Sequence, residues 1–312
     1  MKSALINVYN DKIDSGVDNE YPTSKNTFRQ PCLQMLIGCR TAGKSYLASK
    51  MLAQAQREKT FDRVYIITPS FNSNKAYFGK YVNEEDVYEP TKESISEVIK
   101  SVEADRDEWE EYLQKKELYE MYKKDAKKNI KKIDEDTLIT YDTFGFFDGI
   151  IPKWKYDKEE PPKSILLLDD CLGSPAILQS SGLTRIATLN RHIAPLAENF
   201  NGRSACGLAV VILSQTYKMS NGISRVLREN LSIITLFKNK QQKQLDAIKE
   251  ELANVVDLDK FDKAYEYATR QKYGSLTIDF KPKCETKTFR KNLNELIIFP
   301  DMTCECDKNK KS

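Results

Sequence analysis

The amino-acid sequence predicts an α/β fold in which helices flank a mostly parallel central sheet. Short apolar runs alternate with segments of helical periodicity along most of the chain, a pattern typical of parallel strands joined by helical crossovers. Residues 165–168 are four apolar residues in succession, as expected for a strand buried on both faces. The 312 residues, 40% apolar and 30% charged, suffice for one such core and an inserted module.

Each element is predicted from its own local pattern. Strands are expected where apolar runs end at polar turn residues, over residues 33–37, 63–70, 165–168, 207–218, 231–240 and 274–280, the last at an edge of the sheet. Helices are expected where apolar residues recur at three and four positions, over residues 44–56, 241–252 and 257–270.

Composition divides the chain into four regions. Residues 1–30 are polar and weakly patterned, and we expect them to form an N-terminal extension. Residues 31–280 carry the predicted sheet and form one domain. Within it, residues 91–160 are a charged helical insertion, in which apolar residues of the 91–135 part predict an amphipathic helix or helix pair. Residues 281–312 are expected to be a loosely held tail.

The stretch GCRTAGKS fits the G-x-x-x-x-G-K-[ST] pattern, known as Walker A. It consists of Gly38, Cys39, Arg40, Thr41, Ala42, Gly43, Lys44 and Ser45. In such a loop, backbone N–H groups surround phosphate oxygens, the lysine meets the β and γ phosphates, and the hydroxyl binds Mg²⁺. The alternative is a chance glycine turn. The predicted strand before the loop and the helix after it favour the phosphate site, since a helix N-terminus attracts anions.

A second acidic motif, of the Walker B kind, follows the strand at residues 165–168. Asp169 and Asp170 stand at the carboxyl end of that strand, where open α/β sheets bind their ligands. We expect the first acid to hold Mg²⁺ and the second to act as general base toward the attacking water. The alternative is an ordinary strand that ends in a turn.

Four segments occur in a specific order: the phosphate loop, ILLLDD, VVILSQTYK and ISRVLRENLSIITLFKNK. Over about residues 31–240 they resemble the poxvirus-type genome-packaging ATPases of large nucleocytoplasmic DNA viruses and virophages, a branch of the FtsK–HerA superfamily. The resemblance implies a RecA-like P-loop NTPase core that forms a homo-oligomeric ring and uses ATP and Mg²⁺. It further implies a motor that pumps double-stranded DNA into a preformed capsid, in the virion or at a viral assembly site in the host cytoplasm.

The resemblance also implies roles for individual residues. Lys44 and Ser45 match the phosphate and Mg²⁺ residues, Asp169 matches the Mg²⁺ acid, and Asp170 stands at the position of the base. Gln215 matches the polar sensor that ends the strand beside the P-loop strand, and an amide can bond either the γ-phosphate or the water. Many relatives carry Glu where this chain has Asp170, and the shorter side chain reaches the water less directly.

Ring ATPases complete each site with an arginine from the neighbouring subunit. Arg191, Arg225 and Arg228 are the candidates, and Arg228 is favoured because it lies shortly before the strand at 231–240. A surface salt bridge is the alternative role for this arginine. The expected partners are double-stranded DNA, further copies of the chain and capsid vertex proteins.

Net charge is +3, so DNA contacts must come from local patches. The candidates are Lys218, Lys238 and Lys240, or the lysines between residues 123 and 132, although a solvated helix face also explains the latter.

The sequence leaves two other functions open. One is a P-loop kinase of a small acceptor, and the other is an NTP-binding assembly switch. No apolar run approaches the ~18–20 residues of a membrane span.

Overall fold

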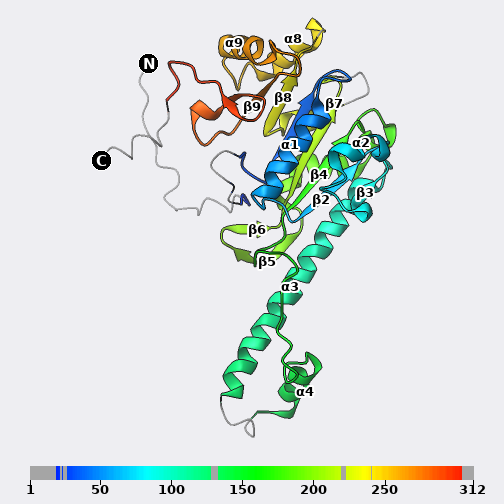
Figure 1. Ribbon diagram of the computed structural model, residues 1–312, viewed down its shortest axis with the longest axis vertical. Helices are drawn as coiled ribbons and strands as arrows, with labels where there is room; N and C mark the ends of the chain where they lie inside the picture. The colour runs from blue at the N-terminus through cyan, green and yellow to red at the C-terminus, as the bar shows by residue number, and fades with distance from the viewer. Residues whose placement is uncertain are drawn as a thin grey trace, which may run out of the picture.

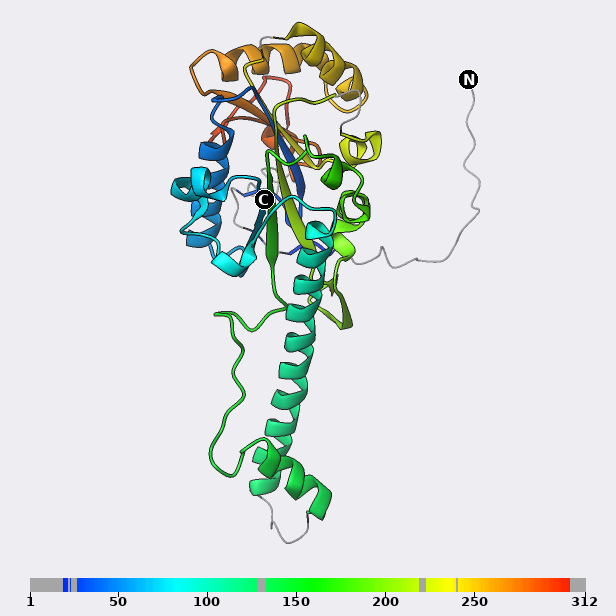
Figure 2. The same ribbon diagram turned by 90° about the vertical axis from the view of Figure 1, so that its right-hand side faces the viewer.

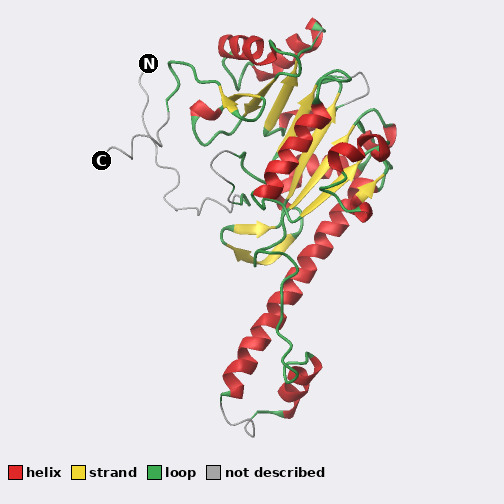
Figure 3. Ribbon diagram, viewed as in Figure 1, coloured by secondary structure: helices red, strands yellow, loops and turns green. Residues whose placement is uncertain are grey.

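The central feature of the computed structural model is a nine-stranded sheet with helices on both faces (Figures 1 and 3). The model describes residues 19–21, 23, 27–127, 133–218, 223–239 and 241–303. The strands run across the sheet in the order β11-β10-β9-β8-β1-β7-β4-β2-β3. Their bounds are β1 Leu33–Ile37, β2 Arg63–Ile67, β3 Val87–Tyr88, β4 Ser164–Asp169, β7 Leu208–Ser214, β8 Ile233–Phe237, β9 Ser275–Asp279, β10 Phe289–Lys291 and β11 Glu295–Leu296.

The described part of the chain also contains helices and a small hairpin. The helices are α1 Lys44–Arg57, α2 Phe71–Phe78, α3 Ser94–Ala126, α4 Glu135–Thr143, α5 Pro175–Leu178, α6 Ser181–Leu189, α7 Arg225–Glu229, α8 Gln242–Leu252 and α9 Leu258–Thr269. The hairpin pairs β5, Pro195–Phe200, with β6, Arg203–Ala205.

The register of the strands brings together the polar residues that follow their carboxyl ends. The strands from β8 to β3 are parallel, and β9 and β10 continue the sheet antiparallel. Strand β1 lies between β7 and β8, with Ile37 opposite Ser214. Because parallel strands end at one edge, the residues that follow β1, β4 and β7 meet there. The predicted α/β class, with a mostly parallel central sheet flanked by helices, is confirmed.

The core is divided between the two faces of the sheet (Figure 2). On β1, Leu36 packs with the cluster under α1 and α2, whereas Met35 and Ile37 pack with the cluster that includes α3, α6 and α7. Side chains alternate along a strand, so a strand with both faces covered needs apolar residues at successive positions. The run LQMLI is buried throughout, and its one polar residue, Gln34, donates to the Thr235 hydroxyl at 3.2 Å.

The insertion is an arm that projects away from the sheet (Figures 1 and 2). Its main element, α3, has 33 residues, about 50 Å of helix. The buried residues of α3 are all in its first 19 positions, from Ser94 to Tyr112. Beyond them, the described part of the arm is joined by aromatic contacts, among which Tyr122 packs on Tyr141 and Phe147. Of the two alternatives predicted for residues 91–135, the described residues form a single long helix, α3, and the short helix α4 begins only at Glu135.

The C-terminal region differs from its prediction. The strand at 274–280 was expected at an edge, but β9 pairs on both sides, with β8 and with β10. The described residues of the predicted loose tail include β10 and β11, which extend the sheet. These strands have three and two residues, too few for a visible alternation of apolar and polar positions. Residues 1–18 and 304–312 lie outside the described residues. Among the described helices, none is long and apolar enough to cross a membrane.

Candidate active site

The phosphate loop connects β1 to α1 at the carboxyl edge of the sheet, and both of its glycines are required by geometry. Gly43 has a φ of 106°, a left-handed conformation that strains any residue with a side chain. Gly38 has no such φ, but a Cβ on it would lie 2.8 Å from the Phe237 Cβ and 3.0 Å from the Ala42 Cβ. The first glycine is therefore required by the close approach of its neighbours and the second by its backbone conformation. Between the glycines, Cys39, Arg40 and Thr41 are exposed.

Lys44 begins α1 and reaches back across the loop. Its Nζ donates to the carbonyl oxygens of Gly38, at 2.8 Å, and of Cys39, at 3.2 Å. Burial lowers the pKa of Lys44, while the charges of Asp170 and Asp169 oppose the shift. The lysine is thus held over the loop, within electrostatic reach of both acids. Ser45 follows in the first turn of α1.

Asp169 is the last residue of β4 and is 4% exposed. Its Oδ2 accepts a 2.6 Å hydrogen bond from Asn74 Nδ2 of α2 and a weaker one, at 3.4 Å, from the Thr68 hydroxyl. Burial raises the pKa of Asp169 to about 6; the charge of Asp170 adds to the shift, and Thr68 and Lys44 oppose it. A carboxylate whose charge is disfavoured by burial gains from a bound cation.

The donor set fits Mg²⁺. The Ser45 hydroxyl and the Asp169 carboxylate are oxygen ligands, which hard divalent cations prefer, and Mg²⁺ commonly takes its other ligands from water and phosphate. Asn74 and Thr68 were not predicted. Thr68 directly follows the predicted apolar run of β2, so its position at the strand end was visible. The position of Asn74 could not be predicted from sequence, because the eight-residue helix α2 that carries it has weak apolar periodicity.

Asp170 stands outside β4 with a φ of 54°, a left-handed conformation that Asp tolerates better than most residues. The Gln215 amide donates to both of its carboxylate oxygens, at 2.9 and 3.0 Å. Gln215 follows β7, and β7 lies between the P-loop strand β1 and the acidic strand β4. The structure therefore brings together the predicted sensor and the predicted base. Strained backbone of this kind is common at catalytic sites.

Arg228, the arginine favoured as the cation for a neighbouring subunit, is paired within its own chain. Its guanidinium forms two hydrogen bonds with Glu251, at 3.0 and 3.1 Å, and its side chain is 11% exposed. It also lies over the ring of Tyr217. These contacts within the chain correspond to the salt-bridge alternative.

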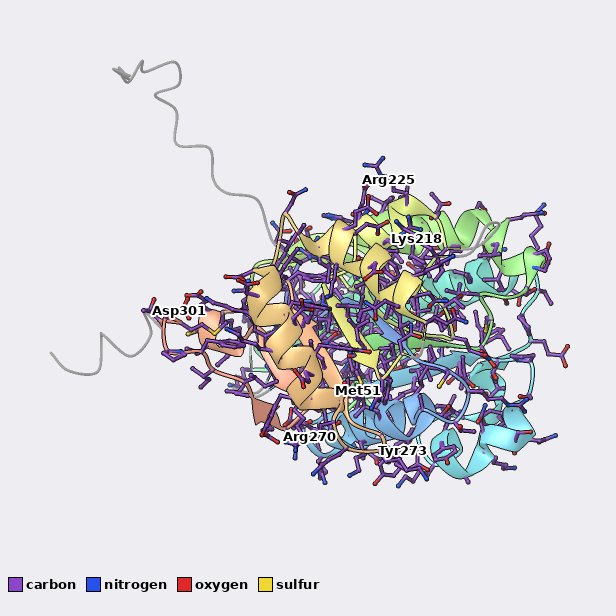
Figure 4. All side chains as sticks on the ribbon, turned by 90° about the horizontal axis from the view of Figure 1, so that it is seen from above. Met51, Lys218, Arg225, Arg270, Tyr273 and Asp301 are labelled. Carbon is purple, nitrogen blue, oxygen red and sulfur yellow. The ribbon has the colours of Figure 1, made fainter. Side chains whose placement is uncertain are left out.

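The other two candidate arginines are placed differently. Arg225 lies one turn earlier on α7, is 81% exposed and pairs with Glu229 of the same helix. Figure 4 shows it extending outward from the molecule. Arg191 is the half-buried middle residue of η3, Asn190–His192. Of the three, Arg225 is the most exposed.

The candidate DNA-contacting lysines are scattered. Lys218 pairs with Glu251 at 3.0 Å, whereas Lys238 is exposed just after β8. Lys240 lies outside the described residues. In the second patch, Lys123 pairs with Glu120 near the end of α3, and residues 128–132 are not described. Neither patch is a dense basic surface in the described part of one chain.

No protein-family model matches the sequence, and no curated protein matches it. Among solved structures, the chain is similar to the genome packaging NTPase B204 of Sulfolobus turreted icosahedral virus 2 in complex with sulfate. The TM-score is 0.41 and the identity 13%, over 83% of this chain and 95% of that one. EssC (ATPases 2 and 3) of Geobacillus thermodenitrificans has a TM-score of 0.45 and 10% identity, over 95% of this chain and 47% of that one.

A third similar structure is the pCW3 conjugation coupling protein TcpA in its monomer form, with a TM-score of 0.43 and 13% identity, over 88% of this chain and 63% of that one. The solved structures to which this chain is similar thus include a genome packaging NTPase.

Proposed function

We propose that this chain is an ATPase that translocates double-stranded DNA and packages a viral genome into a preformed capsid. The observation that supports hydrolysis most strongly is the Gln215–Asp170 pair, with bonds of 2.9 and 3.0 Å. The strand that carries Gln215 separates the P-loop strand from the acidic strand. One amide can therefore contact both the acid and a phosphate bound in the loop.

The proposed division of labour follows from the positions of the side chains. Lys44 neutralises the β and γ phosphates of ATP, and Ser45 and Asp169 hold Mg²⁺, which when bound screens the phosphate charge. Asp170 accepts a proton from the water that attacks the γ-phosphorus, and ADP leaves. Each Asp170 oxygen has a further lone pair for the water beside its bond from Gln215. In this arrangement the amide holds the base and can contact the phosphate, and so links the state of the one to the state of the other.

Translocation is the part of the proposal that rests on the order of the motifs. A motor that passes over a whole genome must grip phosphates without reading sequence. With a net charge of +3, one chain has little basic surface for this. A ring directs several copies of a small patch at one channel and so concentrates a modest charge. Lys238 and the lysines near the end of α3 are the candidates for that patch, and Arg225 is the candidate for the cation that completes a neighbouring site.

The experiment is a steady-state ATPase assay with and without linear duplex DNA, with the oligomer mass measured in the same preparation. The proposal predicts DNA stimulation in the oligomer only, without sequence preference and weaker at higher salt. Stimulation in a strictly monomeric preparation would contradict the ring. Phosphate transfer to a small acceptor would instead identify a kinase. Tight nucleotide binding with negligible turnover would identify an assembly switch.

A further inference from the structure

An exposed aromatic ring lies against the phosphate loop, on the side away from the acids. Tyr273 is in the turn between α9 and β9. A Cβ built on Gly43 would lie 3.5 Å from Tyr273 Cδ1 and 3.6 Å from its Cβ. Despite this contact, the Tyr273 residue is 55% exposed. Its φ is 66°, a conformation that is rare for a bulky residue outside functional sites and tight turns.

The strand order sets the direction in which a bound nucleotide extends. Asp170 and Gln215 follow β4 and β7, so the γ-phosphate must lie on that side of the loop. Tyr273 precedes β9, on the opposite side of β1 in the order β9-β8-β1-β7-β4. The α-phosphate and the nucleoside therefore extend toward β8 and β9. Figure 4 shows Tyr273 at the rim of the molecule, on the other side from Arg225 and Lys218.

We propose that the Tyr273 ring is the platform on which the nucleobase stacks. This inference rests on the proposed ATPase function. The Lys272 ammonium lies 4.9 Å from the centroid of the ring, so a face of the ring is open to a flexible surface group. A planar nucleobase displaces the Lys272 ammonium and stacks on the ring. Because every base has a π-face, stacking recognises bases by area rather than by hydrogen-bonding pattern. The site should therefore favour purine over pyrimidine triphosphates and discriminate weakly between ATP and GTP.

The test uses calorimetric binding of Mg–ATP, Mg–CTP and inorganic tripolyphosphate to the full chain. Wild type is compared with Tyr273→Ala, Tyr273→Phe and a control, Tyr267→Ala, which removes a 48% exposed tyrosine of α9. We expect Tyr273→Ala to weaken ATP binding by about 5- to 100-fold, the range for one base–aromatic stack. Tripolyphosphate affinity should be unchanged, Tyr273→Phe should bind ATP as wild type does, and the control should too.

Two results would overturn the inference while leaving the ATPase proposal intact. In one, Tyr273→Ala binds ATP as tightly as wild type. In the other, it loses ATP and tripolyphosphate equally, which means that the ring only supports the loop. If wild type binds neither ATP nor tripolyphosphate, the phosphate-site assignment itself is wrong, and the stacking platform falls with it.

Discussion

The carboxyl edge of the sheet and the projecting arm are built in contrasting ways. At the edge, a few residues in unusual backbone conformations hold the site, among them Gly43 at a φ of 106° and Asp170 at a φ of 54°. In the arm, aromatic rings on α3 and α4 pack on one another while charged residues cover the surface. The edge thus tolerates little substitution, whereas many sequences of the same composition would form the arm.

The two regions are joined by a buried cluster of charges. Asp105 of α3, 2% exposed in its side chain, accepts from Arg63 Nη1 at 3.1 Å and from Lys155 Nζ at 2.6 Å. Arg63, which begins β2, also donates to the fully buried Asp86. The arm is therefore anchored to the sheet by groups that are costly to leave unpaired. Substitutions at the edge should therefore affect ATP hydrolysis, whereas substitutions at the joint should affect the stability of the fold.

The largest expected effect is at the edge. Lys44→Ala should abolish ATP hydrolysis and greatly weaken ATP binding, because the phosphates lose their nearest cation. Turnover and nucleotide affinity are the measurements. The matched control is Lys115→Ala, a lysine of the arm paired with Glu111, which should leave the basal rate unchanged. Near-wild-type turnover in Lys44→Ala would refute the phosphate-site assignment.

The next effect is at the joint. Asp105→Ala removes a buried carboxylate that two cations share, but Arg63 keeps Asp86 and Lys155 keeps Glu108. We therefore expect a loss of about 1–3 kcal/mol in the free energy of unfolding. Urea unfolding measures it. Asp107→Ala, on the exposed side of the same helix, should change stability by less than about 0.5 kcal/mol. Equal effects in the two variants would show that Asp105 is not an anchor.

The smallest effect concerns the Glu251 cluster near α7. Burial opposes the shift, but hydrogen bonds from Arg228, Tyr217 and Lys218 lower the pKa of Glu251 to about 2. A depressed folded-state pKa contributes stability above the unfolded value of 4.5, and this stability is lost as pH falls from about 4.5 to about 2. Glu251→Gln should therefore be less stable near neutral pH and show a shallower loss of stability over that range. If the free energy of unfolding falls as steeply with pH in Glu251→Gln as in wild type, the ionisation of Glu251 does not contribute to stability.

Much of the edge could be predicted from sequence, because its chemistry is carried by rare residue types at fixed spacing. The phosphate loop was predicted from the spacing of Gly38, Gly43 and Lys44. The apolar run at residues 165–168 predicted that Asp169 and Asp170 lie at the end of a strand. The contact of Gln215 with Asp170 followed only once strand order was known, since it joins residues 45 positions apart.

Other features carried no local signal. The two short strands of the tail are stabilised by pairing with β9 rather than by their own patterns. The ion pair of Arg228 with Glu251 joins residues 23 positions apart, so it is a tertiary contact without a local sequence pattern. Asn74 and Tyr273 are ordinary polar and aromatic residues in sequence, and only the fold brings them to the site.

The central claim is that Asp169 and Asp170, adjacent in sequence, divide metal binding from catalysis. The most direct measurement is single-turnover hydrolysis of ATP by Asp170→Asn and Asp169→Asn, with Mg–ATP affinity measured on the same samples. The account predicts that Asp170→Asn binds Mg–ATP normally but hydrolyses it about 10²- to 10⁴-fold more slowly, whereas Asp169→Asn loses Mg²⁺-dependent binding. Equal loss of binding in both variants, or normal turnover by Asp170→Asn, would contradict it.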